Sequence, residues 1–487
     1  MKKYKLIRFL MFTLPVIMLF SCDSFLDIEP QQSVSNEVVY DTHEGVTNAL
    51  NGAYEVIAGP ELYAGSSIFH SDLVGNSNDM LWAGTFVGYR NMNQKNMDPN
   101  APTITSKWIT AYDAINITNN VLDNLDIVNE SQRNRVEGEA RFIRGIMYFE
   151  LVRFYALPFV DGQTNDHDGV PLVLTPTEGI SEEDDVSRSS VADVYEQIIE
   201  DLTEAKQLLA DYPTPLSNGG RASSAGAAGF LARAYMATEN WSQAAIEADF
   251  VIGLMGGTDA LNPIPRLAFN NDDYTSEDVF MIRQNAVSNA GQANDGIATF
   301  FASLNGLGRG DVNISDSHME RYEEDDLRAT ITDDDEISII SDVNTMFYVG
   351  IGTNPGQLMT SKWGKHDANI PVIRLAEMIL TRAEANYRAG SATGAAPLDD
   401  INVIRNRAGI DDWDNLDLDM IWEERFRELC FEGHLLDDLK RFRKSATPVS
   451  GPYADEEIMW DDGRLVLPIP QRETDTNPNL VQNEAYQ

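Results

Sequence analysis

Apolar residues recur at intervals of three and four positions along most of this chain, a spacing that commits it to packed amphipathic helices. Residues 191–209 are the clearest case, because Ser190 and Asp193 form a capping box at the start of that run. A second run covers about 136–152 and is stopped by Pro158. The sequence therefore predicts a mainly α protein.

Two further stretches have the pattern of helical hairpins. Residues 224–251 turn at 238–240, and residues 373–404 turn around 390–394. Small residues alternate with large ones on their arms, which allows close helix packing and is typical of tetratricopeptide repeats of about 34 residues. Because one hairpin cannot bury its own apolar face, we expect several to stack into a scaffold.

The chain changes character between these helical blocks. Residues 59–106 and 255–369 are rich in Gly, Asn, Asp and Pro, and they include short β-like pieces such as 346–349. Loops longer than about 15 residues inside a compact protein usually serve a function. We therefore expect a tetratricopeptide-like scaffold with two long irregular excursions and short β segments, and a ligand site on the excursions.

The amino terminus has the layout of a secretory signal. Four basic residues precede the apolar run 9–20, which is too short for a spanning helix and contains Pro15. Residues 19–22, Leu-Phe-Ser-Cys, resemble the lipobox of bacterial lipoproteins, in which the cysteine, here Cys22, is acylated. Plain secretion with an ordinary thiol at Cys22 is the alternative. The predicted organisation is a signal peptide at 1–21, a lipidated tether at 22–35, a first scaffold part at 36–254, a loop-rich ligand-binding part at 255–369 and a second scaffold part at 370–487.

Cysteine and charge usage limit the partners. Only Cys430 remains besides Cys22, so lipidation of Cys22 rules out an intramolecular disulfide and a Cys-based metal site. The part after residue 21 has 32 basic and 77 acidic side chains, net −45, because the first 21 residues contribute four of the 36 basic side chains and no acidic one. Such a charge repels polyanions, so we expect no nucleic-acid binding and a neutral ligand.

Short motifs follow one another along nearly the whole chain. They lie at 25–30, 49–54, 138–145, 169–172, 374–377, 382–385, 401–409, 424–434, 438–441, 467–470 and 477–480. In this order they resemble the SusD/RagB family of Bacteroidetes outer-membrane lipoproteins. One departure is Leu435-Leu436, where the family has an aromatic residue after Gly-His, and we expect it to affect packing rather than ligand.

The resemblance implies a mostly helical protein with four tetratricopeptide-like hairpins. It also implies a lipid-anchored protein on the outside of the outer membrane that binds oligosaccharides and delivers them to a partner TonB-dependent transporter, which it caps like a lid. Two alternatives stay open: a peptide-binding importer lid, and a scaffold or gating subunit with little affinity for glycan. The sequence lacks His-Glu-x-x-His, Gly-x-Ser-x-Gly and Walker motifs, so we expect no enzyme.

Most charged residues of these motifs are predicted to be structural. We expect ion pairs between helices from Arg141, Arg144, Arg425 and Arg427 with Glu139, Glu424 and Glu428. His434 is predicted to pack rather than to act as a catalyst or metal ligand.

A sugar presents a face of C–H groups and a rim of hydroxyls, so its binder needs an exposed aromatic plane with amides and carboxylates beside it. Segment 70–90 offers that mixture, and family members place ligand contacts in this excursion. The leading candidates are Trp82, Asn78 and Asp79, followed by Tyr89 and Arg90. For Trp82, the alternative role is to pack the loop onto the scaffold.

The second excursion adds Phe300, Phe301, Asn305, Tyr348 and Trp363 as candidates. Two adjacent phenylalanines cannot both face one core in a strand, so we expect one of them to be exposed. Trp363 is the most prone to burial, because a helix is predicted to follow it.

No cofactor is expected. Acidic runs at 182–185, 323–326 and 333–335 leave a calcium site as an alternative, although none has the Asp-x-Asp-x-Asp-Gly pattern.

Overall fold

The computed structural model describes residues 39–177, 185–290, 294–332 and 344–487. The expected signal peptide, the tether and Cys22 lie outside these ranges, as do the acidic residues 182–184 and 333–335. No helix within the ranges has the length and apolarity that crossing a bilayer requires.

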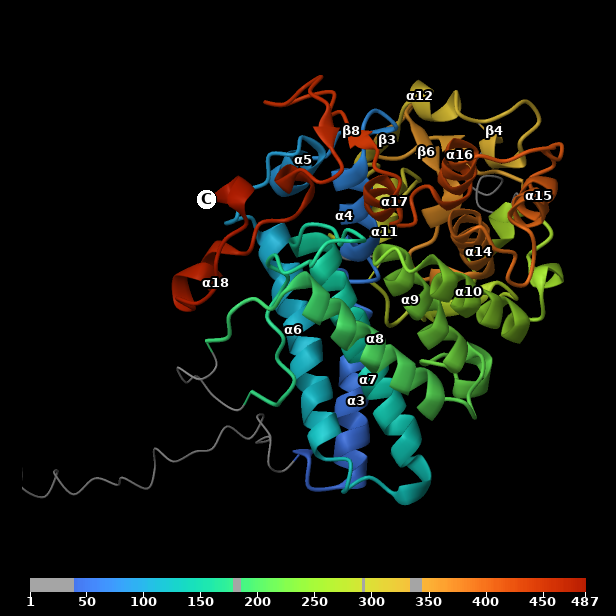
Figure 1. The fold of residues 1–487 in the computed structure, drawn as a ribbon. Helices are drawn as coiled ribbons and strands as arrows, with labels where there is room; N and C mark the ends of the chain where they lie inside the picture. The colour runs from blue at the N-terminus through green and yellow to red at the C-terminus, as the bar shows by residue number, and fades with distance from the viewer. Residues whose placement is uncertain (1–38, 178–184, 291–293, 333–343) are drawn as a thin grey trace, which may run out of the picture.

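The scaffold is a series of helices in which each packs against the next along the chain. They are α3 (His43–Ile57), α6 (Pro102–Asp123), α7 (Glu130–Tyr155), α8 (Val191–Leu208), α9 (Ser224–Ala237), α10 (Trp241–Met255), α14 (Leu375–Ala389) and α15 (Pro397–Arg407). Figure 1 shows the series passing from α3 and α6 through α8 to α14 and α15 on the other side of the molecule. The mainly helical, tetratricopeptide-like prediction is confirmed.

Helix α8 shows why these residues are helical. The Ser190 hydroxyl accepts a hydrogen bond from the Asp193 amide at 3.0 Å and donates one to the Asp193 carboxylate at 2.6 Å, as the sequence predicts. This contact satisfies one amide that the first turn leaves unpaired. Most apolar positions of the helix, spaced by three and four, are buried, and Ile199 and Leu208 are half-buried.

Glycines let α7 approach α8 closely. A Cβ atom added at Gly138 would lie 2.9 Å from the Leu209 Cγ, and one at Gly145 would lie 3.0 Å from the Leu202 Cγ. Real Cβ atoms rarely come so near another carbon, so any larger residue at either position would push the helices apart.

Both predicted hairpins form, with one correction. The arms α9 and α10 meet at 238–240 as expected, but residues Ile370–Arg374 form strand β7, so the later hairpin begins at Leu375 and not at Ile373. The reason is non-local: β7 pairs with β2 (Asp278–Ile282), and the Ile373 side chain fills the space that Gly229 leaves on α9.

The two excursions contain most of the short elements. The first holds α4 (Ser66–Gly75), β1 (Met80–Trp82) and α5 (Val87–Asn93); the second holds β2, α11 (Ile297–Phe301), β3 (Val312–Ile314), α12 (Asp316–Met319), β4 (Ile331–Thr332), β5 (Phe347–Val349) and β6 (Leu358–Thr360). Antiparallel pairing of β1 with β3 joins one excursion to the other. Strand β5 pairs with β4 in parallel and with β6 antiparallel, and it confirms the β-like piece expected at 346–349.

The carboxyl-terminal part adds α16 (Leu418–Leu429), α17 (Leu435–Arg441), α18 (Gln471–Thr476) and the antiparallel pair β8 (Ser445–Ala446) and β9 (Ile458–Met459). Short 3-10 turns complete the described part: η3 (Pro215–Asn218), η4 (Thr258–Ala260), η5 (Pro265–Ala268), η6 (Leu327–Ala329), η7 (Ser361–Trp363), η8 (Gly463–Leu465) and η9 (Glu484–Tyr486).

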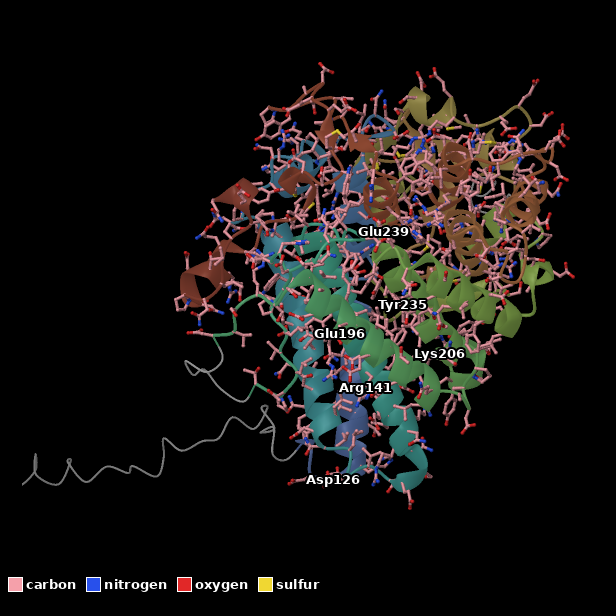
Figure 2. All side chains as sticks on the ribbon, in the orientation of Figure 1. Asp126, Arg141, Glu196, Lys206, Tyr235 and Glu239 are labelled. Carbon is pink, nitrogen blue, oxygen red and sulfur yellow. The ribbon has the colours of Figure 1, made fainter. Side chains whose placement is uncertain are left out.

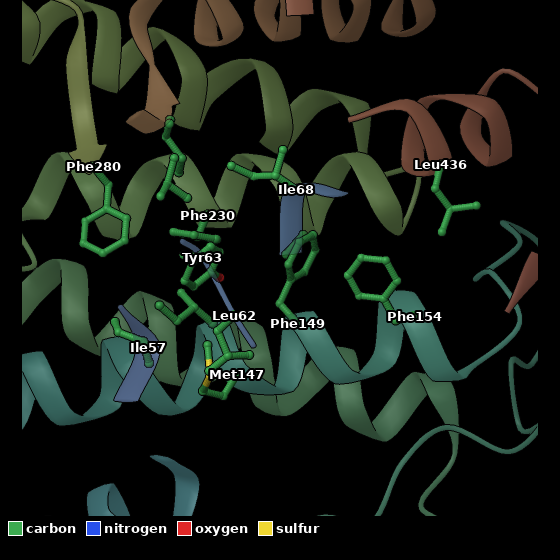
Figure 3. Close-up of a cluster of buried hydrophobic side chains, with 14 of the residues drawn as sticks. Ile57, Leu62, Tyr63, Ile68, Met147, Phe149, Phe154, Phe230, Phe280 and Leu436 are labelled. Carbon is green, nitrogen blue, oxygen red and sulfur yellow. The ribbon is translucent and has the colours of Figure 1, made fainter. Parts of the chain in front are cut away.

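One hydrophobic core joins the scaffold to the excursions. In Figure 3, Tyr63 from the first excursion, Phe149 from α7, Phe230 from α9 and Phe280 from β2 lie in one cluster. The Phe230 ring centroid is 6.1 Å from that of Tyr63 and 6.0 Å from that of Phe280, in edge-on contacts. The excursions are therefore anchored in the interior of the protein through buried side chains.

The charged motif residues form ion pairs between elements, as predicted. Arg141, labelled in Figure 2, lies 3.3 Å from Asp201 and 2.9 Å from Glu204 across the α7–α8 contact. The other pairs between elements are Arg144 with Asp201, Glu139 with Arg221, Arg425 with Asp438, Arg427 with Glu323, Glu424 with Arg328 and Arg405, and Glu428 with Arg374 and Arg407. Glu139 also pairs with Arg135 within α7.

Candidate functional site

Trp82 closes strand β1 beside an aromatic cluster. Its backbone is opposite Val312 of β3, and its ring centroid lies 5.6 Å from Phe69 and 5.3 Å from Tyr89. The side chain is half-buried, and its indole nitrogen is buried with no hydrogen-bond partner among the residues that the structure describes. Trp82 thus packs the excursion onto the interior, yet part of its ring stays accessible, so both roles foreseen for it are compatible with its position.

The solvent side of this cluster forms a small mixed surface. We call it the Trp82 surface and define it by Trp82, Phe86, Val87, Arg90, Asn294 and Arg309. Phe86 is half-buried, Val87 is 59% exposed, and Arg90 and Asn294 are exposed. The surface thus combines partly exposed aromatic rings, which can stack on a sugar ring, with amide and guanidinium groups, which can bond its hydroxyls.

Arg309 contacts several residues of the Trp82 surface. Its guanidinium carbon is 5.0 Å from the Phe86 ring centroid, and its Nε donates to the Asp311 carboxylate at 2.8 Å. A second guanidinium nitrogen donates to the Asn294 carbonyl at 3.1 Å. Burial raises the pKa of Asp311, and Arg309 opposes that rise. Because the Asp311 carbonyl also accepts from the Ala83 amide at 2.7 Å, the loop after β1 is fixed to the same group of residues.

Arg90 and Tyr89 have different roles although they are neighbours. The Arg90 guanidinium reaches the Gly84 carbonyl at 3.4 Å and is otherwise open to solvent, so it remains available to a ligand. Tyr89 is 3% exposed, and its hydroxyl donates to Asp295 at 3.3 Å. Burial, with a contribution from Asp295, raises the pKa of Tyr89 well above its usual range. The structure therefore corrects the expectation that Tyr89 offers a binding face.

Asn78 and Asp79 lie at the start of the same strand and not on the Trp82 surface as defined. Asn78 is exposed, and its carbonyl accepts from the hydroxyls of Ser315 and Ser317. The Asp79 carboxylate is 3.3 Å from Arg321, which also binds Glu423 of α16 at 2.9 Å. Burial raises the pKa of Asp79, while Arg321 lowers it. Asp79 is thus engaged in an ion pair, whereas Asn78 stays a candidate.

The expectation that Phe300 or Phe301 is exposed is wrong. Both are 0% exposed, because they belong to helix α11 and not to a strand, and α11 is enclosed on two sides. Phe300 stacks on Phe69 with centroids 4.3 Å apart, and Phe301 contacts Phe431 at 5.7 Å.

Tyr348 and Trp363 are buried as well, so neither can offer a ring face to a sugar. The Tyr348 hydroxyl accepts from the Ser303 amide at 2.8 Å within a small apolar cluster. The Trp363 indole donates to the Phe431 carbonyl at 2.9 Å, and its ring packs on Phe269. Trp363 was the candidate most prone to burial, and it is buried. Asn305, in contrast, is exposed.

Arg309 and Val87 were missed by the sequence reasoning. In the sequence, Arg309 stands out only because it lies two residues before Asp311, just ahead of β3. The pairing of β1 with β3 in the structure is what brings Arg309 against Phe86. Such a contact between residues more than 200 positions apart leaves no local pattern in the sequence.

The acidic runs show no metal site where they are described. Glu323 lies 2.7 Å from both Arg405 and Arg427, and these contacts lower its pKa to about 2. Asp326 pairs with Arg328 at 2.8 Å. Across the described ranges, no group of three or more His, Cys, Asp and Glu side chains is arranged to hold a metal ion.

A narrow cleft beside α17 holds His434. It has a volume of about 70 Å³ and lies between α7, α8, α9 and α17. Burial lowers the pKa of His434 well below its usual range, and Arg233 and Arg425 add to this effect. The acids around the cleft are engaged by cations, for example Glu377 by Arg233 at 2.7 Å. This environment suits a packed, neutral histidine, as predicted.

Two family models match the sequence. The one described as starch-binding, associating with the outer membrane, covers residues 24–236, and the one described as the SusD family covers residues 341–486. SusD-like protein P2 of Formosa agariphila is 28% identical over 538 aligned positions, which span 99% of each chain.

Solved structures share the fold. A SusD superfamily protein from Bacteroides thetaiotaomicron has a TM-score of 0.76 at 24% identity and covers 91% of this chain and 99% of its own. The surface glycan-binding protein A of the same organism has a TM-score of 0.72 at 21% identity and covers 92% of this chain and 100% of its own.

Proposed function

The chain belongs to the SusD/RagB family of glycan-binding proteins associated with the outer membrane, and from that premise we propose that it captures oligosaccharides outside the cell for a partner TonB-dependent transporter. In this proposal Cys22 carries the lipid anchor. The protein binds its ligand without altering it.

The observation that carries the proposal is the Trp82 surface. Trp82 and Phe86 are two aromatic side chains left partly open at the rim of a buried aromatic cluster, with Arg90 and Asn294 exposed beside them. Hydrogen bonds and ring contacts from β1, α5 and the 294–311 segment fix this arrangement before a ligand arrives. A preformed site binds with little ordering cost.

The charge environment supports binding without catalysis. Hydrolysis of a glycosidic bond requires one carboxyl group that can donate a proton and a second that can act as base or nucleophile. Asp311 is engaged by Arg309, and Asp79 is engaged by Arg321. Each carboxylate is thus held in an ion pair rather than standing free beside the Trp82 surface, although burial raises the pKa of both.

Calorimetry tests the proposal directly. The chain from Asp23 onward, which contains all described residues, is titrated with neutral oligosaccharides and with peptides. We expect heat from at least one glycan series and about a two- to tenfold loss of affinity in Phe86→Ala, the range for one aromatic contact. Trp241→Ala is the matched control, because that tryptophan on α10 also lies under an arginine, Arg388, at 4.6 Å.

Four outcomes would contradict parts of the proposal. Heat from peptides alone would make the chain a peptide binder, and absence of heat from both classes would leave a gating subunit. Glycan binding that Phe86→Ala and Trp82→Ala leave unchanged would move the site elsewhere, and released sugar products would restore an enzyme. Delivery is tested separately, by mass spectrometry of detergent extracts for a TonB-dependent transporter that co-purifies with the lipoprotein.

A further inference from the structure

A second concave feature lies away from the Trp82 surface. It is a groove of about 630 Å³ between the carboxyl end of α3, the turn at Arg221 and the end of β2. Its wall includes Asn51, Tyr54 and Glu55 on α3 and residues 280–284 and 288–290. The volume is in the range of small-ligand sites. We call it the α3 groove.

Two amide side chains of the groove have unsatisfied polar atoms. Gln284 is 8% exposed, and its side-chain nitrogen has no hydrogen-bond partner among the described residues. The side-chain oxygen of Asn289 is likewise buried without a partner there. The Gln284 backbone is held in place, since its amide donates to the Asn369 side chain at 3.0 Å. A buried donor and acceptor left unpaired cost free energy, which a hydroxylated ligand would recover once a side-chain movement exposes these two atoms.

The groove also contains two arginines, of which one is paired with a carboxylate and the other is not. Arg221 stacks over the Tyr54 ring at 4.5 Å, lies 2.5 Å from Glu139 and donates to Asn51 at 2.8 Å. The charge of Arg221 is therefore paired inside the protein, although its Nε has no hydrogen-bond partner among the described residues.

Arg283 is exposed and has no carboxylate within 4.0 Å in the part of the chain that the structure describes. Its guanidinium carbon is 5.8 Å from the centre of the Tyr274 ring, so the side chain leans on an aromatic support while its charge stays open. In a chain with 77 acidic and 36 basic side chains, an arginine without an acidic partner gives the groove wall an uncompensated positive charge.

From these contacts we infer that the α3 groove binds an acidic sugar within a glycan chain, with its carboxylate at Arg283 and its hydroxyls at Gln284 and Asn289. The planar guanidinium can bind a carboxylate through two parallel hydrogen bonds. Glu55 is exposed on the α3 wall of the groove and would repel a second acidic group on the ligand. The groove therefore has one position for a carboxylate, at Arg283. This inference rests on the proposed function and names part of the ligand.

The net charge of the protein does not prevent such binding. Charges more than a Debye length apart, about 8 Å at physiological ionic strength, are largely screened. The contacts at Arg283 therefore decide whether a single carboxylate is accepted, while the distant acidic surface still disfavours a long polyanion. The inference thus differs from the expectation of a wholly neutral ligand, which was drawn from net charge alone.

The matched probes are trigalacturonic acid and galactotriose, which differ in their carboxylates. Calorimetry with the chain from Asp23 onward is expected to show about tenfold tighter binding of the acid at low salt, a preference that shrinks as sodium chloride is added. Arg283→Gln is expected to remove the preference and to leave galactotriose affinity unchanged, whereas Arg283→Lys keeps part of it. Arg443→Gln is the control, because Arg443 is an exposed arginine beside Glu239, outside the groove.

Equal affinity for the two trimers in the wild type, or a preference that survives Arg283→Gln, overturns the inference. A sulfated galactotriose that binds more tightly than the uronate overturns the assignment to a carboxylate. If neutral glycans bind through the Trp82 surface without any preference for acid, only the groove fails. If no glycan of either kind binds, the proposed function fails as well.

Discussion

Glu428 gives the sharpest test of how this protein is held together. Its carboxylate is buried on α16, 2.7 Å from Arg374, 2.5 Å from Arg407 and 3.4 Å from Arg328. Removing one member of a buried ion pair costs about 3–5 kcal/mol, because the remaining charge stays buried.

The arginines around Glu428 each keep another partner. Arg374 retains Glu432 at 2.6 Å, Arg407 retains Glu277 at 2.7 Å, and Arg328 retains Asp326 at 2.8 Å. We therefore place Glu428→Gln at the low end of the range, at about 3 kcal/mol. A chain of 487 residues has an unfolding entropy of about 1 kcal/mol/K, so the expected fall in Tm is about 3 °C.

The effect depends on pH in a defined direction. Burial alone would raise the pKa of Glu428, but Arg407, Arg374 and Arg328 together lower it well below the usual value. An unfolded glutamate titrates near about 4.3, so this stabilisation is fully present above that pH and is lost as the pH falls toward the folded pKa. The difference between wild type and Glu428→Gln should therefore narrow between pH 7 and about pH 3.

Thermal unfolding followed by circular dichroism at both pH values provides the measurement. Glu456→Gln is the control, since Glu456 pairs with Arg464 at the surface, where ion pairs contribute less than about 1 kcal/mol. If Glu428→Gln is no more harmful than Glu456→Gln, or its cost is the same at both pH values, the account of a charged buried network is refuted.

Three further predictions concern packing, the anchor and the thiol. Gly145→Leu should lower the free energy of unfolding by about 1–3 kcal/mol, because the new side chain would push α7 away from α8. Gly253→Ala should raise it by up to about 1 kcal/mol, because no atom lies within 4 Å of the new methyl group. Denaturant unfolding curves of the two variants measure both changes. Cys22→Ala should move the protein from the membrane fraction to the soluble fraction, which immunoblots of fractionated cells detect. Cys430 is buried and burial raises its pKa, so it should react with a thiol reagent at pH 8 at least about tenfold more slowly in native than in denatured protein.

The scaffold could be predicted because its determinants are local. The spacing of apolar residues and the Ser190 cap define α8 without reference to the rest of the chain, and the turn at 238–240 separates α9 from α10 in the same way. The start of α14 was misplaced because Ile373 belongs to a strand whose partner, β2, lies about 90 residues earlier.

The geometry of the proposed binding surface was predictable only in part. Segment 70–90 is aromatic and polar in sequence, but the sequence could not show which rings face solvent. Phe300 and Tyr89 are buried because Phe69, from another element, lies against both. Arg283 had no distinguishing pattern, since its importance depends on the absence of a nearby carboxylate in the described structure.

The interior closes only when distant parts of the chain meet. The Arg153 guanidinium donates to the Gly433 carbonyl 280 positions away, the Lys440 ammonium donates to the Arg153 carbonyl, and α17 lies against α4. Contacts of such high sequence separation form slowly, because a long loop must close before they contribute. A chain that lacks α17 would leave α4 uncovered, so folding cannot be completed until residues beyond 440 have been added to the chain.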